Sequence, residues 1–324
     1  MQANKKIQKK IGFTFYQPKL VSIEKFYGKE DDLIEETWNA SKTLEYFLNK
    51  NTKEKNFESE DIELDINTLE QIKNLYFFQL AKLRVDNVPS RKKIGEAREE
   101  IMLMDDEYIG EFSGILYDLS SSCFVIQNNR FGPSVKEIEL YLNFLRNKYI
   151  EETGLDKSTE KMVKLYIVVD EKAVETIPDS KEIRKISLKS NTFCMANFVK
   201  DNTTDLKIIN EAISKFGNVT FDISITAHVD EITKERSLEK NEALSFIKEI
   251  KEYLNFDKNG KAEVVRKYDD DSKVETIDFL LPSMRYYCNV SLEPRKAIGK
   301  DNLKMIMLGI FEKNSSKLSK LLAK

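Results

Sequence analysis

Lysine and arginine side chains form clusters along the second half of the sequence, and such clusters suit the binding of phosphate groups. The clusters are Lys181, Arg184, Lys185 and Lys189; Lys234, Arg236 and Lys240; Arg295, Lys296 and Lys300; and Lys313, Lys317, Lys320 and Lys324. A nucleic-acid surface needs several cations, because each one that neutralises a phosphate releases a counterion. Since acidic residues alternate with these cations, each cluster alone is also typical of a solvated face.

Eight of these cations are predicted to contact DNA. They are Lys234, Arg236, Lys240, Lys181, Arg184, Lys185, Lys313 and Lys317. On a helical wheel of 100° per residue, Lys313 and Lys317 fall within about 60° of Lys320 and Lys324. A C-terminal helix would therefore have one cationic face.

Side chains for nucleophilic or metal-centred catalysis are few. The single histidine, His228, follows an apolar stretch. It is expected to face solvent or a neighbouring carboxylate rather than to act as a general base or a pH-sensitive group. Cys123, Cys194 and Cys288 lie far apart and form no CxxC pair. Cys123 and Cys194 stand in apolar stretches interpreted as strands, where cysteine acts as a small core residue. The sequence therefore predicts no catalytic residue, no metal site and no cofactor.

A metal-dependent nuclease is the alternative from the enzyme class. This chemistry needs carboxylates that hold Mg²⁺ against a phosphate, and Asp179, Glu182 or Asp270 could supply them. Similar fragments are expected by chance in a chain with 52 basic and 55 acidic residues. The phosphate-binding loops GxxxxGK[ST] and GxGxxG do not occur in the sequence, which argues against a nucleotide-binding enzyme.

Composition sets wide limits on the class of protein. The 324 residues carry a net charge of −3, and 41% of them are hydrophobic, which suffices for packed cores. No stretch reaches the ~18 apolar residues of a membrane span. Lys5, Lys6, Lys9 and Lys10 precede no apolar segment of the kind found in signal peptides. With three scattered cysteines and no disulfide framework, we expect a cytoplasmic protein.

Both kinds of secondary structure are expected to position these residues. Periodic apolar residues predict strands at 11–17, 75–83, 108–118, 123–128, 165–169, within 183–199 and at 219–227, and helices at 38–49, after Pro133, at 205–216, 238–254 and about 301–323. Residues 263–268, 274–281 and 286–292 are predicted to form a three-stranded meander. The fold class is α+β, in a two-domain chain whose mixed or antiparallel sheets are flanked by helices.

The polar stretch 151–161 predicts the linker between the two domains. Residues 1–158 would form an N-terminal α+β domain, and residues 159–324 a C-terminal α+β domain with a basic face. The first range holds 23 basic and 28 acidic side chains, and the second holds 29 and 27. This difference directs the search for anion binding towards the second domain.

Residues 105–145 combine an acidic start, a predicted hairpin and the turn Arg130-Phe131-Gly132-Pro133-Ser134, which leads into a helix. We predict a structural turn, in which Gly132 allows a positive φ, Pro133 begins the approach to the helix and Ser134 caps it. This order of elements resembles the RexA-type phage-exclusion proteins of temperate phages.

The resemblance implies a homodimer of two-domain subunits that binds double-stranded DNA without strong sequence preference. It also implies a role in phage exclusion, with a membrane protein as effector partner. It places the DNA contact on Lys234, Arg236 and Lys240.

A third hypothesis is an interaction module that senses a phage protein through the polar segment 84–107.

Overall fold

The computed structural model divides the chain into two compact units. Unit 1 contains Met1–Val168 and Met284–Lys324, and unit 2 contains Val169–Ser283. The structure describes residues 7–29, 35–51, 53–58, 63–84, 88–104, 107–155, 161–201, 205–231, 236–254, 260–267, 274–278, 282–292 and 297–323. No described helix is both long enough and apolar enough to cross a membrane.

Unit 1 is built on an antiparallel sheet that curls into a half-barrel. Its strands run in the order β10 (Lys161–Ile167), β1 (Ile7–Ser22), β9 (Cys123–Asn128), β8 (Ile109–Asp118), β5 (Leu75–Arg84), β4 (Glu63–Ile72) and β3 (Phe57–Glu58). Two more strands, β15 (Arg285–Leu292) and β2 (Glu36–Thr37), also pair with β1. A separate hairpin joins β6 (Arg91–Lys92) to β7 (Arg98–Glu99).

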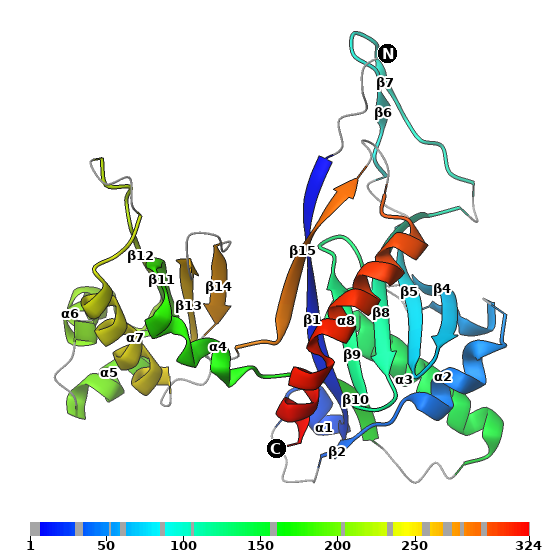
Figure 1. Ribbon diagram of the computed structural model, residues 1–324, viewed down its shortest axis with the longest axis horizontal. Helices are drawn as coiled ribbons and strands as arrows, with labels where there is room; N and C mark the ends of the chain where they lie inside the picture. Colours follow the sequence, from blue (N-terminus) through cyan, green and yellow to red (C-terminus); the bar gives the residue numbers. More distant parts are fainter. Residues whose placement is uncertain are drawn as a thin grey trace. The chain divides into compact units, whose positions relative to one another are not determined.

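Helices cover both faces of this sheet (Figure 1). The core on one face includes residues of α2 (Ser41–Leu48) and α3 (Val135–Thr153), and the core on the other includes residues of α8 (Lys300–Leu322). Successive strand residues alternate between them, so that Phe78 lies in the first core and Phe77 in the second. Because both faces are covered, the consecutive residues 76–81 of β5 are all buried, in the segment where the sequence predicts a strand at 75–83. The short helices α1 (Ile23–Phe26) and η1 (Lys53–Lys55) complete the unit.

Two strands meet end to end along one edge of β1. Residues 7–14 of β1 pair with β15, and residues 16–22 pair with β10. At the junction, the Phe15 N–H donates to the Met284 carbonyl at 3.0 Å, and the Val168 N–H donates to the Phe15 carbonyl at 2.9 Å. The chain leaves unit 1 after Val168 and returns at Met284, so unit 2 is an insertion between two strands of one sheet.

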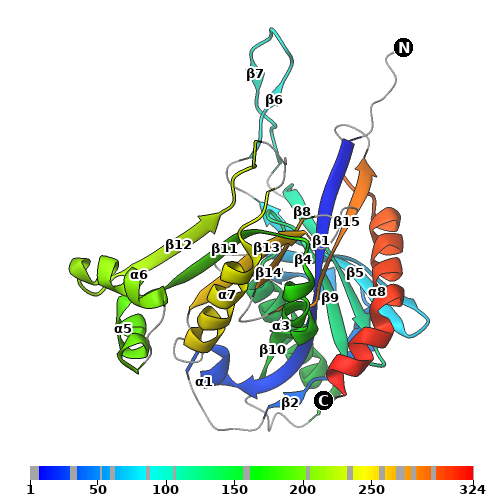
Figure 2. The ribbon, with the colours of Figure 1, turned by 60° about the vertical axis from the view of Figure 1, so that its left-hand side comes forward.

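Unit 2 has a four-stranded antiparallel sheet with helices on one face (Figure 2). The strand order is β12 (Thr220–Thr226), β11 (Glu182–Asn191), β13 (Lys261–Lys267) and β14 (Glu275–Asp278). Its helices are α4 (Glu171–Glu175), η2 (Ile177–Asp179), α5 (Thr192–Asp201), α6 (Asp205–Ile213), η3 (Ser214–Phe216) and α7 (Lys240–Leu254). The core joins Ile186 and Val264 of the sheet to Phe198 of α5 and Tyr253 of α7.

The α+β class is confirmed, but the division of the chain differs from the predicted one at residue 158. The sequence assigned all of 159–324 to a second domain, whereas the structure places 284–324 in unit 1. The predicted three-stranded meander is also wrong, because its third strand belongs to the sheet of unit 1. Strands β13 and β14 do pair with each other, but β15 pairs with β1 instead of β14.

The turn before α3 is capped as predicted. The Glu137 N–H donates to Ser134 Oγ at 3.3 Å, and the Ser134 N–H donates to Glu137 Oε2 at 2.6 Å, which forms a capping box. The prediction of a positive φ at Gly132 is wrong. Glycine is needed there for a different reason, since a β-carbon at Gly132 would collide with the hydroxyl of Ser113.

The predicted strand around Cys194 is also wrong. Strand β11 ends at Asn191, and Cys194 lies in the first turn of α5. The Asn191 side chain accepts a hydrogen bond from the Cys194 N–H at 2.9 Å, which satisfies one of the donors at the start of the helix. Cys123 occupies the predicted core position in β9 and is completely buried.

Candidate nucleic-acid interface

The excess of positive charge belongs to the C-terminal segment, which the structure assigns to unit 1. Residues 284–324 carry nine basic and three acidic side chains. With this segment, unit 1 holds 34 basic and 32 acidic residues, whereas unit 2 holds 18 and 23. The net charge is therefore +2 in unit 1 and −5 in unit 2, which reverses the location of the basic face expected from the sequence.

The second half of α8 carries three lysines along one side of the helix. Lys313 and Lys320 are exposed, and Lys317 is half-buried, with its Nζ 6.0 Å from the centroid of the Tyr286 ring. The side of the helix that faces the sheet is apolar, with Met307 and Leu318 buried. We call Lys313, Lys317 and Lys320 the α8 lysines.

Two lysines at the start of α8 have a different role. Lys304 Nζ lies 2.8 Å from the carboxylate of Glu70 on β4, and Lys300 binds the same carboxylate. The hydrogen bonds from Lys300 and Lys304 lower the pKa of Glu70. These two cations anchor the helix to the sheet, so the charge available to an external anion lies further along α8.

Three of the predicted DNA contacts lie at or near the start of β11 in unit 2. Lys181 is exposed, while Arg184 is half-buried at a bulge in the strand. Arg184 forms an ion pair with Glu182, with Nη2 2.6 Å from Oε2. Lys185 is half-buried and pairs with Thr226 on one side and Val265 on the other. The Glu182 carboxylate already compensates the charge of Arg184.

The other predicted cluster in unit 2 is only partly described. Lys234 lies outside the described residues. Arg236 is exposed, and its Nε donates to the Ala227 carbonyl at 3.0 Å, which ties it to the end of β12. Lys240 is exposed as the first residue of α7. His228 is exposed, as expected for a histidine that follows a strand.

The residues of the nuclease alternative do not form a metal site in the part of the chain that the structure describes. Asp179 is exposed at the end of η2, and Glu182 is buried against Arg184. Asp270 lies outside the described residues. Throughout the described segments, no three His, Cys, Asp or Glu side chains lie close enough together to hold a metal ion.

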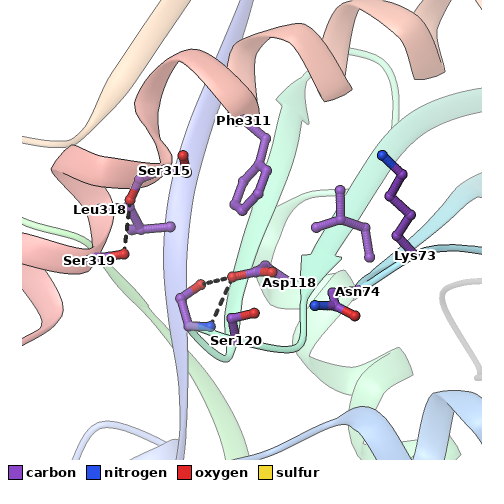
Figure 3. A pocket seen from close by; sticks show the side chains of 10 residues that line it. Lys73, Asn74, Asp118, Ser120, Phe311, Ser315, Leu318 and Ser319 are labelled. Carbon is purple, nitrogen blue, oxygen red and sulfur yellow. Dashed lines mark hydrogen bonds between the residues drawn. The ribbon is translucent and has the colours of Figure 1, made fainter.

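A cleft of about 330 Å³ lies between α8 and two hairpin turns of the unit 1 sheet (Figure 3). Phe311 and Leu318 contribute apolar walls, and Ser315 and Ser319 lie on the helix side. The Asp118 carboxylate accepts hydrogen bonds from the Ser121 N–H at 2.8 Å and from its hydroxyl at 2.6 Å. The Asp118 carboxylate therefore stabilises the β8–β9 turn. Because these hydrogen bonds account for it, the carboxylate does not indicate a ligand in the cleft.

A second cationic surface lies on three adjacent strands. Strands β15, β1 and β9 contain no Asp or Glu, in a chain with 55 acidic residues, and Lys10 and Arg285 lie on one face of them. Lys9 points to the opposite face, and Lys19 forms an ion pair with Glu35 at 2.9 Å. Tyr287 is half exposed, and Lys10 Nζ lies 4.2 Å from the centroid of its ring. Arg285 and Tyr287 share one face of β15, because alternate residues of a strand point the same way.

Comparison with protein families places the chain in one of them. The model of DUF6731, a family of unknown function, matches residues 6–320. The chain belongs to DUF6731. No curated protein matches the sequence. The family match carries no link to the RexA-type proteins.

In this DUF6731 protein, the predicted DNA contacts are divided between the two units. Lys313 and Lys317 lie along one side of α8 in unit 1, and the other six belong to unit 2.

Sequence reasoning missed the surface around Tyr287. An available signal was the lack of acidic residues from Ile7 to Ser22, but the pairing of this segment with residues 285–292 could not be inferred from local pattern.

Proposed function

We propose that this protein binds double-stranded DNA without sequence preference and without catalysis, and that the α8 lysines are its principal contacts. The observation that carries the proposal is the charge of residues 284–324, where nine basic residues accompany three acidic ones. Lys313 and Lys320 are exposed on the outer side of α8, while its inner side is packed on the sheet.

Lysine ammonium groups suit contacts with the DNA backbone. They bind phosphates as point charges, so they position a protein on DNA without reading its sequence. The acidic isoelectric point of the whole chain, about 5.7, is compatible with such a surface. A local patch of one sign attracts its ligand even when the net charge of the protein has the opposite sign.

The biological part of the proposal is phage defence. We propose that the protein acts in the cytoplasm as a homodimer in phage exclusion, with a membrane protein as effector partner. This part rests on the resemblance of residues 105–145 to the RexA-type proteins. The capped turn at Gly132, Pro133 and Ser134 has a structural role of its own and adds no independent support for kinship.

A gel-shift experiment tests DNA binding directly. Random-sequence duplex would be mixed with the full chain at 50 and 200 mM salt, with and without Mg²⁺. We expect a shift at low salt that weakens steeply at high salt, because released counterions drive the binding. A plasmid incubated with Mg²⁺ or Mn²⁺ should stay intact. Nicking would favour the nuclease alternative, and no shift at low salt would overturn DNA binding.

One observation favours the alternative of an interaction module. The β6–β7 hairpin and the residues after it expose large apolar side chains, including Ile94, Met102 and Met104. Exposed apolar side chains gathered in one segment are typical of protein-contact sites. Pull-down from phage-infected cells after nuclease treatment, with Met102→Ser/Met104→Ser as the matched variant, tests this function. Recovery of a phage protein with the wild type but not with this variant would support the function, and recovery of no phage protein would count against it.

A further inference from the structure

The ring of Tyr287 lies on the backbone of the neighbouring strand. Tyr287 is paired with Gly12 in the register of β15 and β1. A β-carbon at Gly12 would come within 2.9 Å of Tyr287 Cε1 and within 3.0 Å of Asn128 Nδ2. The ring therefore occupies the space that a side chain at position 12 would fill. With half of the side chain exposed, the ring is held in place but still offers surface to solvent.

A row of hydrogen bonds fixes the residues beside this ring. Arg285 Nε donates to Thr14 Oγ1 at 3.1 Å, and Thr14 Oγ1 donates to Asn128 Oδ1, also at 3.1 Å. The row crosses the three strands β15, β1 and β9. Thr14 is completely buried, whereas Arg285 and Asn128 are exposed. A cation and an amide are thus held at defined positions next to the ring.

Lys10 lies on the other side of Tyr287 along the strands. Its Nζ is 4.2 Å from the ring centroid, a distance at which the cation is attracted to the aromatic face. We call Lys10, Gly12, Asn128, Arg285 and Tyr287 the tyrosine platform. Its three strands contain no Asp or Glu, so none of their own side chains would repel a phosphate.

We propose that the tyrosine platform binds an unpaired base of a single-stranded nucleic acid. The base would stack on Tyr287, and Lys10 and Arg285 would bind the phosphates on either side. Sheet surfaces that bind single strands combine these two features, an exposed aromatic ring and flanking cations. The inference rests on the proposed function only in taking nucleic acid as the ligand, because it uses none of the α8 lysines.

The placement of the ring favours an unpaired base over a duplex. In a duplex the faces of the bases are covered by their neighbours, so a ring on a sheet surface cannot reach them. An unpaired base exposes its face and can stack on tyrosine whatever its identity. Lys10 already covers part of the Tyr287 ring, so an incoming base would displace the ammonium group towards the phosphate beside it.

Fluorescence anisotropy with the full chain tests this inference. The probes would be a labelled twelve-nucleotide thymidine strand and a labelled random duplex, both at low salt. We expect Tyr287→Ala to weaken binding of the single strand about 5- to 150-fold, the range that corresponds to one base stacked on an aromatic residue. Tyr287→Phe should keep most of the affinity, because it retains the ring. Tyr27→Ala removes another exposed tyrosine and is the matched control.

A spectroscopic readout separates stacking from a general loss of charge or fold. In a Trp38→Phe/Tyr287→Trp chain, the single indole would report on the platform, and stacking by thymidine should quench its fluorescence. Thermal unfolding of each variant checks that it is folded. No quenching on addition of the single strand, or equal affinities of wild type and a folded Tyr287→Ala, would overturn the inference.

The two probes also separate this inference from the proposed function. If the single strand does not bind but the duplex does, the tyrosine platform is not a nucleic-acid site and duplex binding stands. If the single strand binds through Tyr287 and the duplex does not bind, the proposed function fails and this inference stands.

Discussion

The Tyr287 ring covers Gly12, so residues from opposite ends of the chain form one surface. The contact exists because β15 returns to unit 1 and pairs with the first half of β1. The same return brings α8 onto the sheet and carries the positive charge of residues 284–324 with it. Both proposed nucleic-acid surfaces therefore depend on one long-range strand pairing.

Replacing Gly12 with alanine should disturb the tyrosine platform. The added β-carbon would lie within 2.9 Å of the Tyr287 ring and force it away from β1. Because Tyr287 and Asn128 are exposed side chains that can shift, we expect a loss in the free energy of unfolding near the lower end of the about 1–3 kcal/mol of overpacked sites, together with weaker binding of single-stranded DNA. Urea unfolding and anisotropy measure the two effects.

Gly309→Ala is the matched control for this change. Gly309 lies inside α8, and no atom lies within 4 Å of a β-carbon added there. Alanine should stabilise the helix by roughly 0.5–1 kcal/mol. If Gly12→Ala were as stabilising as Gly309→Ala, the close approach of the Tyr287 ring would be wrong.

The turn before α3 gives a second prediction about packing. Gly132→Ala should destabilise the protein by about 1–3 kcal/mol, because its β-carbon would collide with Ser113 Oγ. Ser113→Gly in the same chain removes that hydroxyl and should relieve the collision. A double-mutant cycle from urea unfolding measures the coupling. Additive effects of the two substitutions would show that the side chains do not meet.

The loss of folding stability as the pH falls below 4.5 should include a contribution from Glu35. Burial raises the pKa of this carboxyl, but hydrogen bonds from Lys25, Lys19 and Tyr166 outweigh it and lower the pKa to about 2. Because the folded-state pKa is below the unfolded value, the stabilisation is complete above about pH 4.5 and is lost as the pH falls towards 2. Solvent screening at this partly exposed site limits the stabilisation to about 1 kcal/mol.

Glu35→Gln removes this ionisation and tests the effect. The variant should be less stable than wild type at pH 6, and the difference should shrink between pH 4.5 and pH 2. Chemical unfolding at a series of pH values gives the comparison. A difference in stability that did not change with pH would mean that the ionised form of Glu35 has no special role.

The cysteines should differ in their reaction with alkylating agents. Cys123 is completely buried, and burial raises the pKa of its thiol. Its Sγ also donates to the Tyr16 carbonyl at 3.2 Å. We expect iodoacetamide to modify Cys123 only under unfolding conditions and to modify the half-buried Cys194 and Cys288 earlier. Peptide mass spectrometry follows each site, and fast native labelling of Cys123 would contradict its position in the core.

Local signals allowed correct predictions where neighbouring residues decide the structure. The hairpin of β8 and β9 follows from two alternating stretches joined by a short polar turn. Ser134 caps α3 because a serine followed three residues later by Glu137 can form both hydrogen bonds of the capping box. These features need no information from distant parts of the chain.

Strand partners could not be predicted in the same way. Residues 285–292 alternate in a pattern that suits an antiparallel neighbour, but the pattern does not say whether that neighbour is β14 or β1. The choice of β1 is made by the core under α8, where Phe13 and Ile11 pack with Met284 and Leu303. Because this choice could not be predicted, the domain boundary and the location of the basic face were predicted wrongly. For the same reason, the tyrosine platform was not predicted at all.

The salt dependence of duplex binding tests the central claim most directly. Lys313→Ala/Lys317→Ala/Lys320→Ala should weaken binding of two unrelated duplexes equally and make the slope of log K against log salt concentration about 2–3 units shallower. A control variant with alanine at the exposed Lys29, Lys42 and Lys172 should keep the wild-type slope. An unchanged slope in the α8 variant, or an equal change in the control, would contradict the assignment of DNA binding to α8.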